Sequence, residues 1–216
     1  MTQDPKDHGV LPQLLNTEHW SLLATRSQTW SEVMGRITTH FTFASAALVV
    51  LALAVQITGV DAAFRVMAIG LGLAVLATGS LTSLRVRNAS QEDLMLVIGM
   101  NRLRAAYVEM DPSVAQHLVT GWTDDEEGIA RTYSMGVARS RRAQFLASAF
   151  LFVGTVNVVV AAGLGAVLAN AAGANGTVAV VIGALSAVLY AALIVFPEHR
   201  GYRRMTRGSD VPQDLA

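Results

Sequence analysis

The sequence predicts an all-α integral membrane protein: four transmembrane helices in two hairpins, with a small helical layer on the cytoplasmic side. Two observations carry this prediction. Charged residues make up 15% of the chain and nearly vanish from four windows, each close to the roughly twenty apolar residues that cross a bilayer. Arginine and lysine residues then gather in the segments that would share one side of the membrane.

The composition and the motifs also exclude several classes of protein. The chain has no cysteine, so disulfide frameworks, thiolate metal sites and cysteine nucleophiles are excluded. Its formal net charge is +0, which argues against a nucleic-acid binder. No phosphate-binding glycine loop or zincin motif is present, and the five histidines lack metal-ligand spacing. We therefore expect no cofactor, no bound metal and no catalytic residues.

The region before the first span contains one predicted helix. Residues 1–16 include two prolines and little periodicity, and we expect a mobile tail there. Asn16 or Thr17 can cap a helix that begins near Glu18. One face of this helix is apolar and carries Trp20, Leu23, Trp30, Val33, Met34 and Ile37. Two interpretations stay open: the helix lies at the membrane surface, or it packs on the middle segment of the chain.

Four runs almost free of charge are the predicted spans, and they cover residues 41–60, 64–84, 145–168 and 177–196. Asp61 marks a very short turn between the first two spans. Arg65 lies close to the start of the second span, where a long side chain can reach the headgroups. The linker 169–176 between the last two spans is uncharged, small and turn-prone.

Basic residues predict the orientation. Of the 16 lysine and arginine residues, only Arg65 lies on the side of the short turns. The positive-inside rule therefore puts both termini and the middle segment in the cytoplasm, and the chain in the inner (plasma) membrane. The chain then divides into a tail with an amphipathic helix (1–37), hairpin 1 (38–84), a cytoplasmic helical segment (85–142), hairpin 2 (143–198) and a basic tail (199–216).

The middle segment begins with a predicted helix of its own. Ser90 and Asp93 have the spacing of a capping box, with Asp in place of the usual Glu or Gln. They would open a helix that ends near Met110, because Asp111 and Pro112 stop it.

Two more helices are predicted before the third span. A short one should cover 113–119, with Gly121 after it. Thr123 and Glu126 again have capping spacing, and the acidic first turn that follows complements a helix dipole. This last helix should run through Tyr133 and continue into the third span.

Small residues predict how the spans pack. In the fourth span they recur every four residues, and the second span offers a shorter pair; the members are Ala179, Gly183, Ala187, Ala191, Gly70 and Ala74. Small side chains let helix backbones approach closely in lipid. The stripe predicts helix association within one chain or between chains, and hence a homo-oligomer. The alternative is chance spacing in an alanine-rich span.

Asn157 lies in the middle of the otherwise apolar third span. A polar side chain in hydrocarbon seeks a partner on a neighbouring helix, so we expect a structural hydrogen bond; a conduction or substrate site is the alternative. No Asp, Glu, Lys, Arg or His lies deep in a predicted span. Ion-coupled transporters place such groups near the midplane, so their absence argues against coupled transport and leaves a passive pore open.

Several arginines of the middle segment are candidate contacts for anionic lipid or a protein partner: Arg102, Arg104, Arg139, Arg141 and Arg142. Their role in setting the topology explains them equally well. The stretch 100–112 (MNRLRAAYVEMDP) resembles a group of uncharacterised bacterial four-span membrane proteins with an MNR-x-R-x-AY-x-E-x-x-P segment after the second span. That resemblance implies the fold but no activity. A looser likeness, in the helix–hairpin–helix plan alone, is to two-span bacterial effector modules.

These features together predict a non-enzymatic, oligomeric interaction or effector protein. Its environment would be the lipid bilayer, it would form a homo-oligomer, and its cytoplasmic face would bind a protein partner. The alternative is a small channel or transporter with its pathway between the two hairpins, near Asn157.

Overall fold

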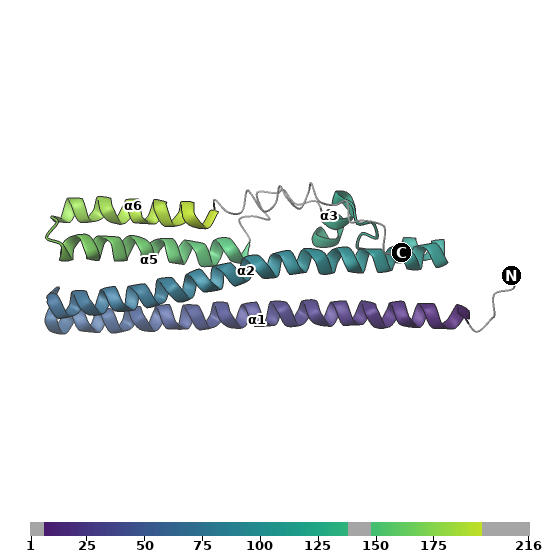
Figure 1. Ribbon diagram of the computed structural model, residues 1–216, viewed down its shortest axis with the longest axis horizontal. Coiled ribbons are helices and arrows are strands. Elements are labelled where there is room, and N and C mark those ends of the chain that lie inside the picture. Colours follow the sequence, from purple (N-terminus) through teal and green to yellow (C-terminus); the bar gives the residue numbers. More distant parts are fainter. Residues whose placement is uncertain (1–6, 138–147, 196–216) are drawn as a thin grey trace, which may run out of the picture. The chain divides into compact units, whose positions relative to one another are not determined.

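The computed structural model describes residues 7–137 and 148–195, and these are helical with short connections (Figure 1). The elements in order are α1 (Asp7–Thr58), α2 (Ala62–Met110), the 3-10 helix η1 (Pro112–His117), α3 (Glu126–Ser134), α5 (Ala149–Ala171) and α6 (Gly176–Val195). Four of them, α1, α2, α5 and α6, are long and apolar enough to cross a membrane. The prediction of an all-α protein with four transmembrane helices is therefore confirmed.

The chain folds as two compact units. Unit 1 comprises residues 1–37 and 84–149, and unit 2 comprises residues 38–83 and 150–216. Helices α1 and α2 contribute to both units, because they are 52 and 49 residues long, whereas about 20 residues cross the hydrocarbon core. The remainder of each helix therefore belongs outside the spans.

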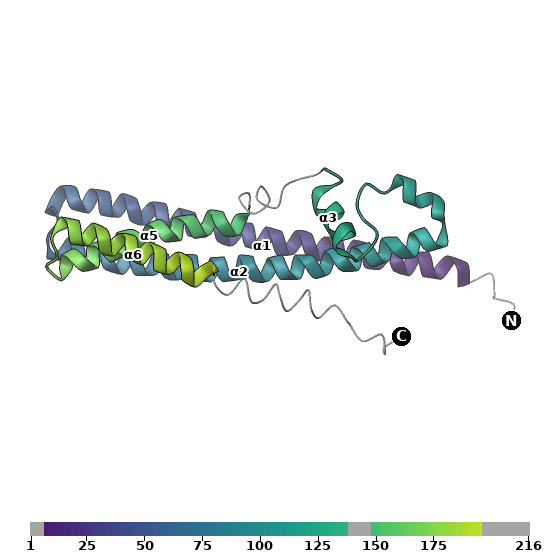
Figure 2. The same cartoon turned by 90° about the horizontal axis from the view of Figure 1, so that it is seen from above.

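Unit 2 contains the membrane-spanning parts of all four long helices, with α5 and α6 side by side in both views (Figures 1 and 2). Its buried apolar cluster joins Ala44 and Ala47 of α1 to Val75 of α2, with Val160 of α5 packed against it. Large apolar side chains on all four helices are exposed, among them Leu53, Leu73, Val159 and Leu185. A water-soluble bundle would bury such residues, so these faces are suited to lipid.

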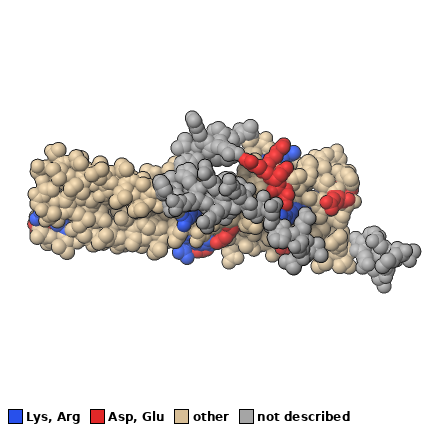
Figure 3. Space-filling view, turned by 45° about the horizontal axis from the view of Figure 1, so that its top comes forward, with Lys and Arg blue, Asp and Glu red and all other residues tan. Residues whose placement is uncertain are grey.

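The surfaces of the two units differ in charge. On the face drawn in Figure 3, acidic and basic side chains gather over unit 1, and the surface of unit 2 is free of charge except for one small spot.

The turns of unit 2 are tight, as predicted. Gly59 has a φ of 67° and Gly173 a φ of 90°, conformations that glycine adopts without a steric penalty. Asp61 caps α2 by accepting a hydrogen bond from the Phe64 N–H at 2.7 Å.

In unit 1, the first part of α1 packs along the last part of α2. Val33 of α1 and Val86, Val97 and Met100 of α2 are almost completely buried. The structure thus favours the second interpretation of the lead-in helix, which packs on the middle segment. The predicted apolar face is only partly right, because Val33 and Ile37 are buried while Trp20, Leu23 and Met34 are exposed.

The predicted start of the lead-in helix is wrong. Helix α1 begins at Asp7, not near Glu18, and Pro12 lies inside it. A proline this close to the helix start removes one backbone hydrogen bond in the second turn, where little of the helix depends on it. The part of the expected tail that covers residues 1–6 lies outside the described residues.

The predicted helix start at Ser90 is also wrong, because α2 passes through it without a break. The Ser90 hydroxyl donates to the Val86 carbonyl at 2.9 Å, within the helix. Asp93 does not cap the backbone at all; its carboxylate accepts from side chains of other helices. The predicted end is correct, since α2 stops at Met110 and Asp111 caps η1 through the Ser113 N–H.

Helix α3 differs from its prediction at both ends. Its N-cap is Asp125, whose carboxylate accepts from the Gly128 N–H at 2.8 Å, and Thr123 instead donates to that carboxylate. The helix ends at Ser134, followed by Met135 at a φ of 51° and Gly136 at 77°. Two consecutive left-handed residues end a helix, so α3 does not continue through them toward the third span. Residues 138–147 lie outside the described part.

Candidate functional site

Asn157 occupies the centre of the most polar region of unit 2. It projects from α5, is completely buried, and its Nδ2 donates to the Ser83 Oγ of α2 at 3.3 Å. A Cβ atom added at Gly79 would overlap the Asn157 amide. The glycine therefore creates the space in which a polar side chain of α5 reaches α2, and the expected interhelical hydrogen bond is present.

Two further helices contribute to this region. His40 of α1 is 2% exposed, and its Nδ1 lies 3.4 Å from the Thr78 Oγ1 of α2. The hydroxyls of Tyr190 of α6 and Ser80 of α2 lie 2.8 Å apart. Asn157 is within hydrogen-bonding reach of both His40 and Tyr190. We call this set the polar cluster; its members are His40, Thr78, Ser80, Ser83, Asn157 and Tyr190.

Unit 1 contains a carboxylate that joins three helices. The Asp93 side chain of α2 is only 4% exposed, and it accepts from Arg26 Nε at 2.6 Å, Trp30 Nε1 at 2.8 Å and Tyr133 Oη at 2.8 Å. Burial raises the pKa of this carboxyl, but the hydrogen bonds from Arg26, Trp30 and Tyr133 outweigh that effect, so its pKa lies below the ordinary value. Asp93 is therefore ionised and holds α1 and α3 against α2.

Asn101 fixes the loop before α3. It is completely buried; its Nδ2 donates to the Thr123 carbonyl at 2.8 Å, and its Oδ1 accepts from Arg104 and Thr132, each at 2.8 Å. Both ends of the amide are thus satisfied, as a buried polar group requires. The Thr132 hydroxyl in turn accepts from the Gly121 N–H at 3.1 Å, which closes the loop on α3.

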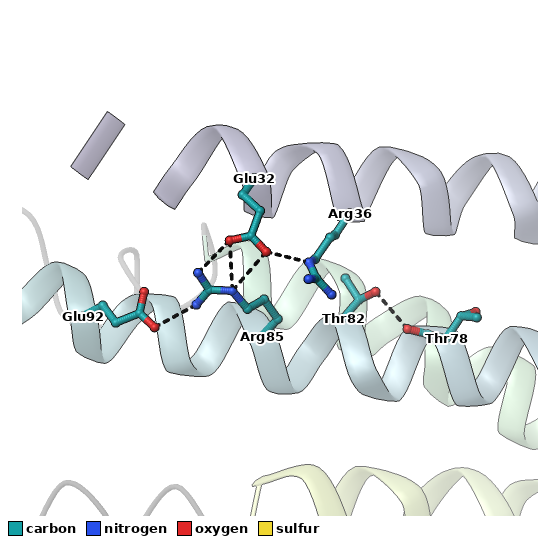
Figure 4. A network of polar contacts seen from close by, with 6 residues as sticks. All are labelled: Glu32, Arg36, Thr78, Thr82, Arg85 and Glu92. Carbon is teal, nitrogen blue, oxygen red and sulfur yellow. Dashed lines mark hydrogen bonds and ion pairs between the residues drawn. The ribbon is translucent and has the colours of Figure 1, made fainter. Parts of the chain in front are cut away.

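A more exposed network ties α1 to α2 (Figure 4). Arg85 lies between two carboxylates, 2.8 Å from Glu32 and 2.9 Å from Glu92, and Arg36 bonds Glu32 at 2.8 Å. Hydrogen bonds from Arg85 and Arg36 lower the pKa of Glu32 to about 2. Because the Glu32, Glu92 and Arg36 side chains are exposed to solvent, water screens these ion pairs and they add little to the stability of the fold. The network sets the register of the helices more than their stability.

The small-residue stripe of α6 packs inside the chain. A Cβ atom at Gly183 would lie 2.7 Å from the Ala162 carbonyl oxygen and 3.2 Å from the Ala166 Cβ of α5, and Ala179 is buried. Ala187 and Ala191 are half-buried. The pair in α2 differs, because Gly70 is exposed and has no atom within 4 Å of an added Cβ, while Ala74 is half-buried.

The candidate arginines fall into three groups. Arg102 is exposed and pairs with Asp124 at 3.0 Å. Arg104 is half-buried and donates to Asn101, so part of its hydrogen-bonding capacity is used inside unit 1. Arg139, Arg141 and Arg142 lie outside the described residues.

Sequence reasoning missed four of the residues that the structure brings together. His40 is one of the five histidines without metal-ligand spacing, Asp93 was predicted to cap a helix, Asn101 appears only within the stretch 100–112, and Tyr190 was not singled out. One signal was available: the second predicted span carries several hydroxyl groups, of which Thr78 lies against His40 and Ser83 against Asn157.

Within residues 7–137 and 148–195, no three His, Asp or Glu side chains are grouped so that they could hold a metal ion. The carboxylates of Asp93, Glu32 and Asp124 are each paired with an arginine. No family model, curated protein or solved structure matches the chain.

Proposed function

We propose that this chain is a non-enzymatic interaction protein of the inner membrane, whose unit 1 faces the cytoplasm and binds a protein partner. The positive-inside rule supports the orientation, because the basic residues of unit 1 flank the spans. One observation carries the proposal of a partner: the amino-terminal end of α1 exposes apolar side chains in the part of the chain that lies outside the spans.

This apolar strip extends beyond the helix that α1 packs on. The contact between α1 and α2 reaches His19, whose ring stacks on Tyr107 at 6.2 Å between centroids, and α2 ends soon after, at Met110. Upstream on α1, Val10, Leu11 and Leu14 are 52%, 53% and 62% exposed. Residues at these spacings share one side of a helix, and a contiguous apolar surface in water is typical of an interaction site.

The remainder of unit 1 supports the strip as a rigid platform. Asp93 and Asn101 hold α1, α2 and α3 together through buried hydrogen bonds. A preorganised surface binds with less loss of conformational entropy than a flexible one. The partner would therefore meet an ordered helix end whose apolar side chains are already in place.

Photo-crosslinking of the full chain in its native membrane tests this function. A photoreactive residue at position 14 is expected to give a discrete adduct, because the partner covers Leu14, and Leu11→Glu should abolish the adduct. The same residue at position 28, where Gln28 is exposed but polar, serves as the matched control and should give none. The mass of the adduct distinguishes a second copy from another protein. Equal labelling at both positions, or none at position 14, contradicts the proposal.

A second candidate function, a small passive pore, is favoured by the polar cluster alone. Its hydroxyl, amide and imidazole groups come from all four helices of unit 2. If small polar solutes pass there, liposomes with the protein should show a permeability that Asn157→Leu removes. Thr155→Val, an exposed site on the same helix, should leave the flux unchanged. Flux that is absent in the native protein rejects the pore.

A further inference from the structure

An acidic side chain adjoins the apolar strip of α1, which Val10, Leu11 and Leu14 form. Glu18 follows Leu14 by about one helical turn, so the two side chains lie on the same side of α1. Glu18 is exposed, and it forms no ion pair with any residue that the structure describes. A carboxylate without a counter-charge therefore lies at the end of the strip.

The end of α2 adds carboxylates to this part of unit 1. Helices α1 and α2 run in opposite directions (Figure 1), and the stacking of His19 on Tyr107 sets their register. Helix α2 stops three residues later, at Met110, and so ends beside the turn of α1 that precedes His19. Glu109 and Asp111 lie at this end, and both are exposed.

Basic residues do not offset these charges. Residues 1–25 and 105–123 hold five acidic residues against a single lysine. The arginines that border these ranges, Arg26 and Arg104, are half-buried, and each already bonds a polar side chain of α2. The right-hand end of the described surface in Figure 3 accordingly shows acidic side chains and no basic ones. The apolar strip thus lies in a region of negative potential.

This potential distinguishes between the possible occupants of the strip. In a two-fold contact, a second copy of the chain would present the same surface, and like carboxylates would face each other. Anionic lipid carries the same sign of charge and would be repelled. A protein surface with lysine or arginine beside apolar side chains is attracted by the carboxylates and covers the leucines.

We propose that the apolar strip binds an amphipathic helix of another protein, whose lysine and arginine side chains lie against Glu18 and the carboxylates at the end of α2. This inference rests on the proposed function and names the chemistry of the partner. The strip is itself helical, and a second helix with apolar residues three and four positions apart packs along such a face. From Val10 to Glu18 the helix rises about 12 Å, so a short partner helix is sufficient.

Binding of designed peptides to the full chain tests the inference. The protein is placed in nanodiscs of phosphatidylcholine, a lipid without net charge, and empty nanodiscs give the background. Two peptides of about 18 residues, long enough to be helical, share one apolar stripe; lysine flanks the stripe in the first and glutamate in the second. The lysine peptide should bind about tenfold more tightly, and added salt should reduce this advantage.

Variants of the chain identify the surface that binds. Glu18→Gln should weaken binding of the lysine peptide about threefold. Gln28→Lys is the matched control, because it changes the net charge by the same amount at an exposed position outside the strip, and it should leave the affinity unchanged. Leu14→Asn should reduce binding of both peptides to background.

The outcomes separate the inference from the proposed function. Equal affinity for the two peptides would mean that the strip binds through its apolar side chains alone, and would overturn the inference. Binding of neither peptide, while position 14 still forms an adduct with another protein, would overturn it as well, because that partner has a different chemistry. An adduct at position 14 with a second copy of the chain would also contradict it. Only the absence of any adduct at position 14 rejects the proposed function too.

Discussion

Asp93→Ala is expected to lower the free energy of unfolding of unit 1 by about 3 kcal/mol. The reason is that three donors, on Arg26, Trp30 and Tyr133, lose the one carboxylate they share. Trp30 and Tyr133 each lose their hydrogen bond to the carboxylate, and Arg26 loses its counter-charge. Hydrogen exchange of the full chain in bilayer nanodiscs measures the effect, and the backbone amides of α3 should lose the most protection.

Glu92→Ala is the matched control for this substitution. It removes a carboxylate one residue away on the same helix, and that carboxylate is half exposed and paired with Arg85. Such a surface pair contributes less than about 1 kcal/mol. If the two substitutions reduce protection equally, or if α3 is no less protected in Asp93→Ala, then the Asp93 contacts do not hold unit 1 together.

The effect of Asp93→Ala should depend on pH in a defined direction. The pKa of Asp93 is lowered from its ordinary 3.8 in the folded protein, so the unfolded state takes up a proton first as the pH falls. The carboxylate therefore stabilises the fold fully above pH 3.8, and this stabilisation is lost as the pH falls through the lower folded pKa. The difference between native protein and variant should be largest at neutral pH and should shrink in acid.

The spans were predictable because their cause lies in the local sequence. Lipid excludes charge, so an uncharged run of sufficient length predicts a membrane span without any knowledge of tertiary contacts. The turns at Asp61 and at 169–176 were predictable for a similar reason, since glycine and Asp act within a few residues. The end of α2 before Pro112 belongs to the same class.

The errors arose where a side chain serves a distant partner. Ser90 and Asp93 have the spacing of a helix cap, but the Asp93 carboxylate accepts hydrogen bonds from side chains of α1 and α3. Helix propensity and the packing of α2 on α1 carry the helix through that point. Local spacing cannot distinguish a capping carboxylate from one that bonds across a bundle.

Of the polar cluster, only Asn157 could be predicted from the sequence. Asn157 stands out because it is polar in an apolar span, whereas His40 lies just before a predicted span, where polar groups are common, and the side chain of Tyr190 is mostly an apolar ring. Their meeting depends on the register of four helices, and that register depends on the close approach at Gly79. The sequence does not indicate which glycine of a span contacts a neighbouring helix, as the contrast between Gly183 and Gly70 shows.

That contrast gives the second large prediction. Gly183→Leu is expected to destabilise unit 2 by about 3 kcal/mol, because even the first side-chain carbon would press on the backbone of α5, 2.7 Å from the Ala162 oxygen. Gly70→Leu introduces the same side chain on another span, at an exposed position with no atom within 4 Å, and should change the stability little. The unfolding free energy of each variant in detergent micelles measures the difference.

The same pair of variants separates packing within the chain from packing between chains. If the α6 stripe packs on α5, Gly183→Leu should lower the free energy of unfolding. The detergent-corrected mass of the variant should then equal that of the native protein until the variant unfolds. If the stripe instead joins two copies, the mass falls while the unfolding of each chain is little changed, and the assignment to α5 is wrong. A loss of mass in Gly70→Leu would point to the exposed face of α2 as the contact between copies, because that substitution leaves the α5–α6 contact untouched.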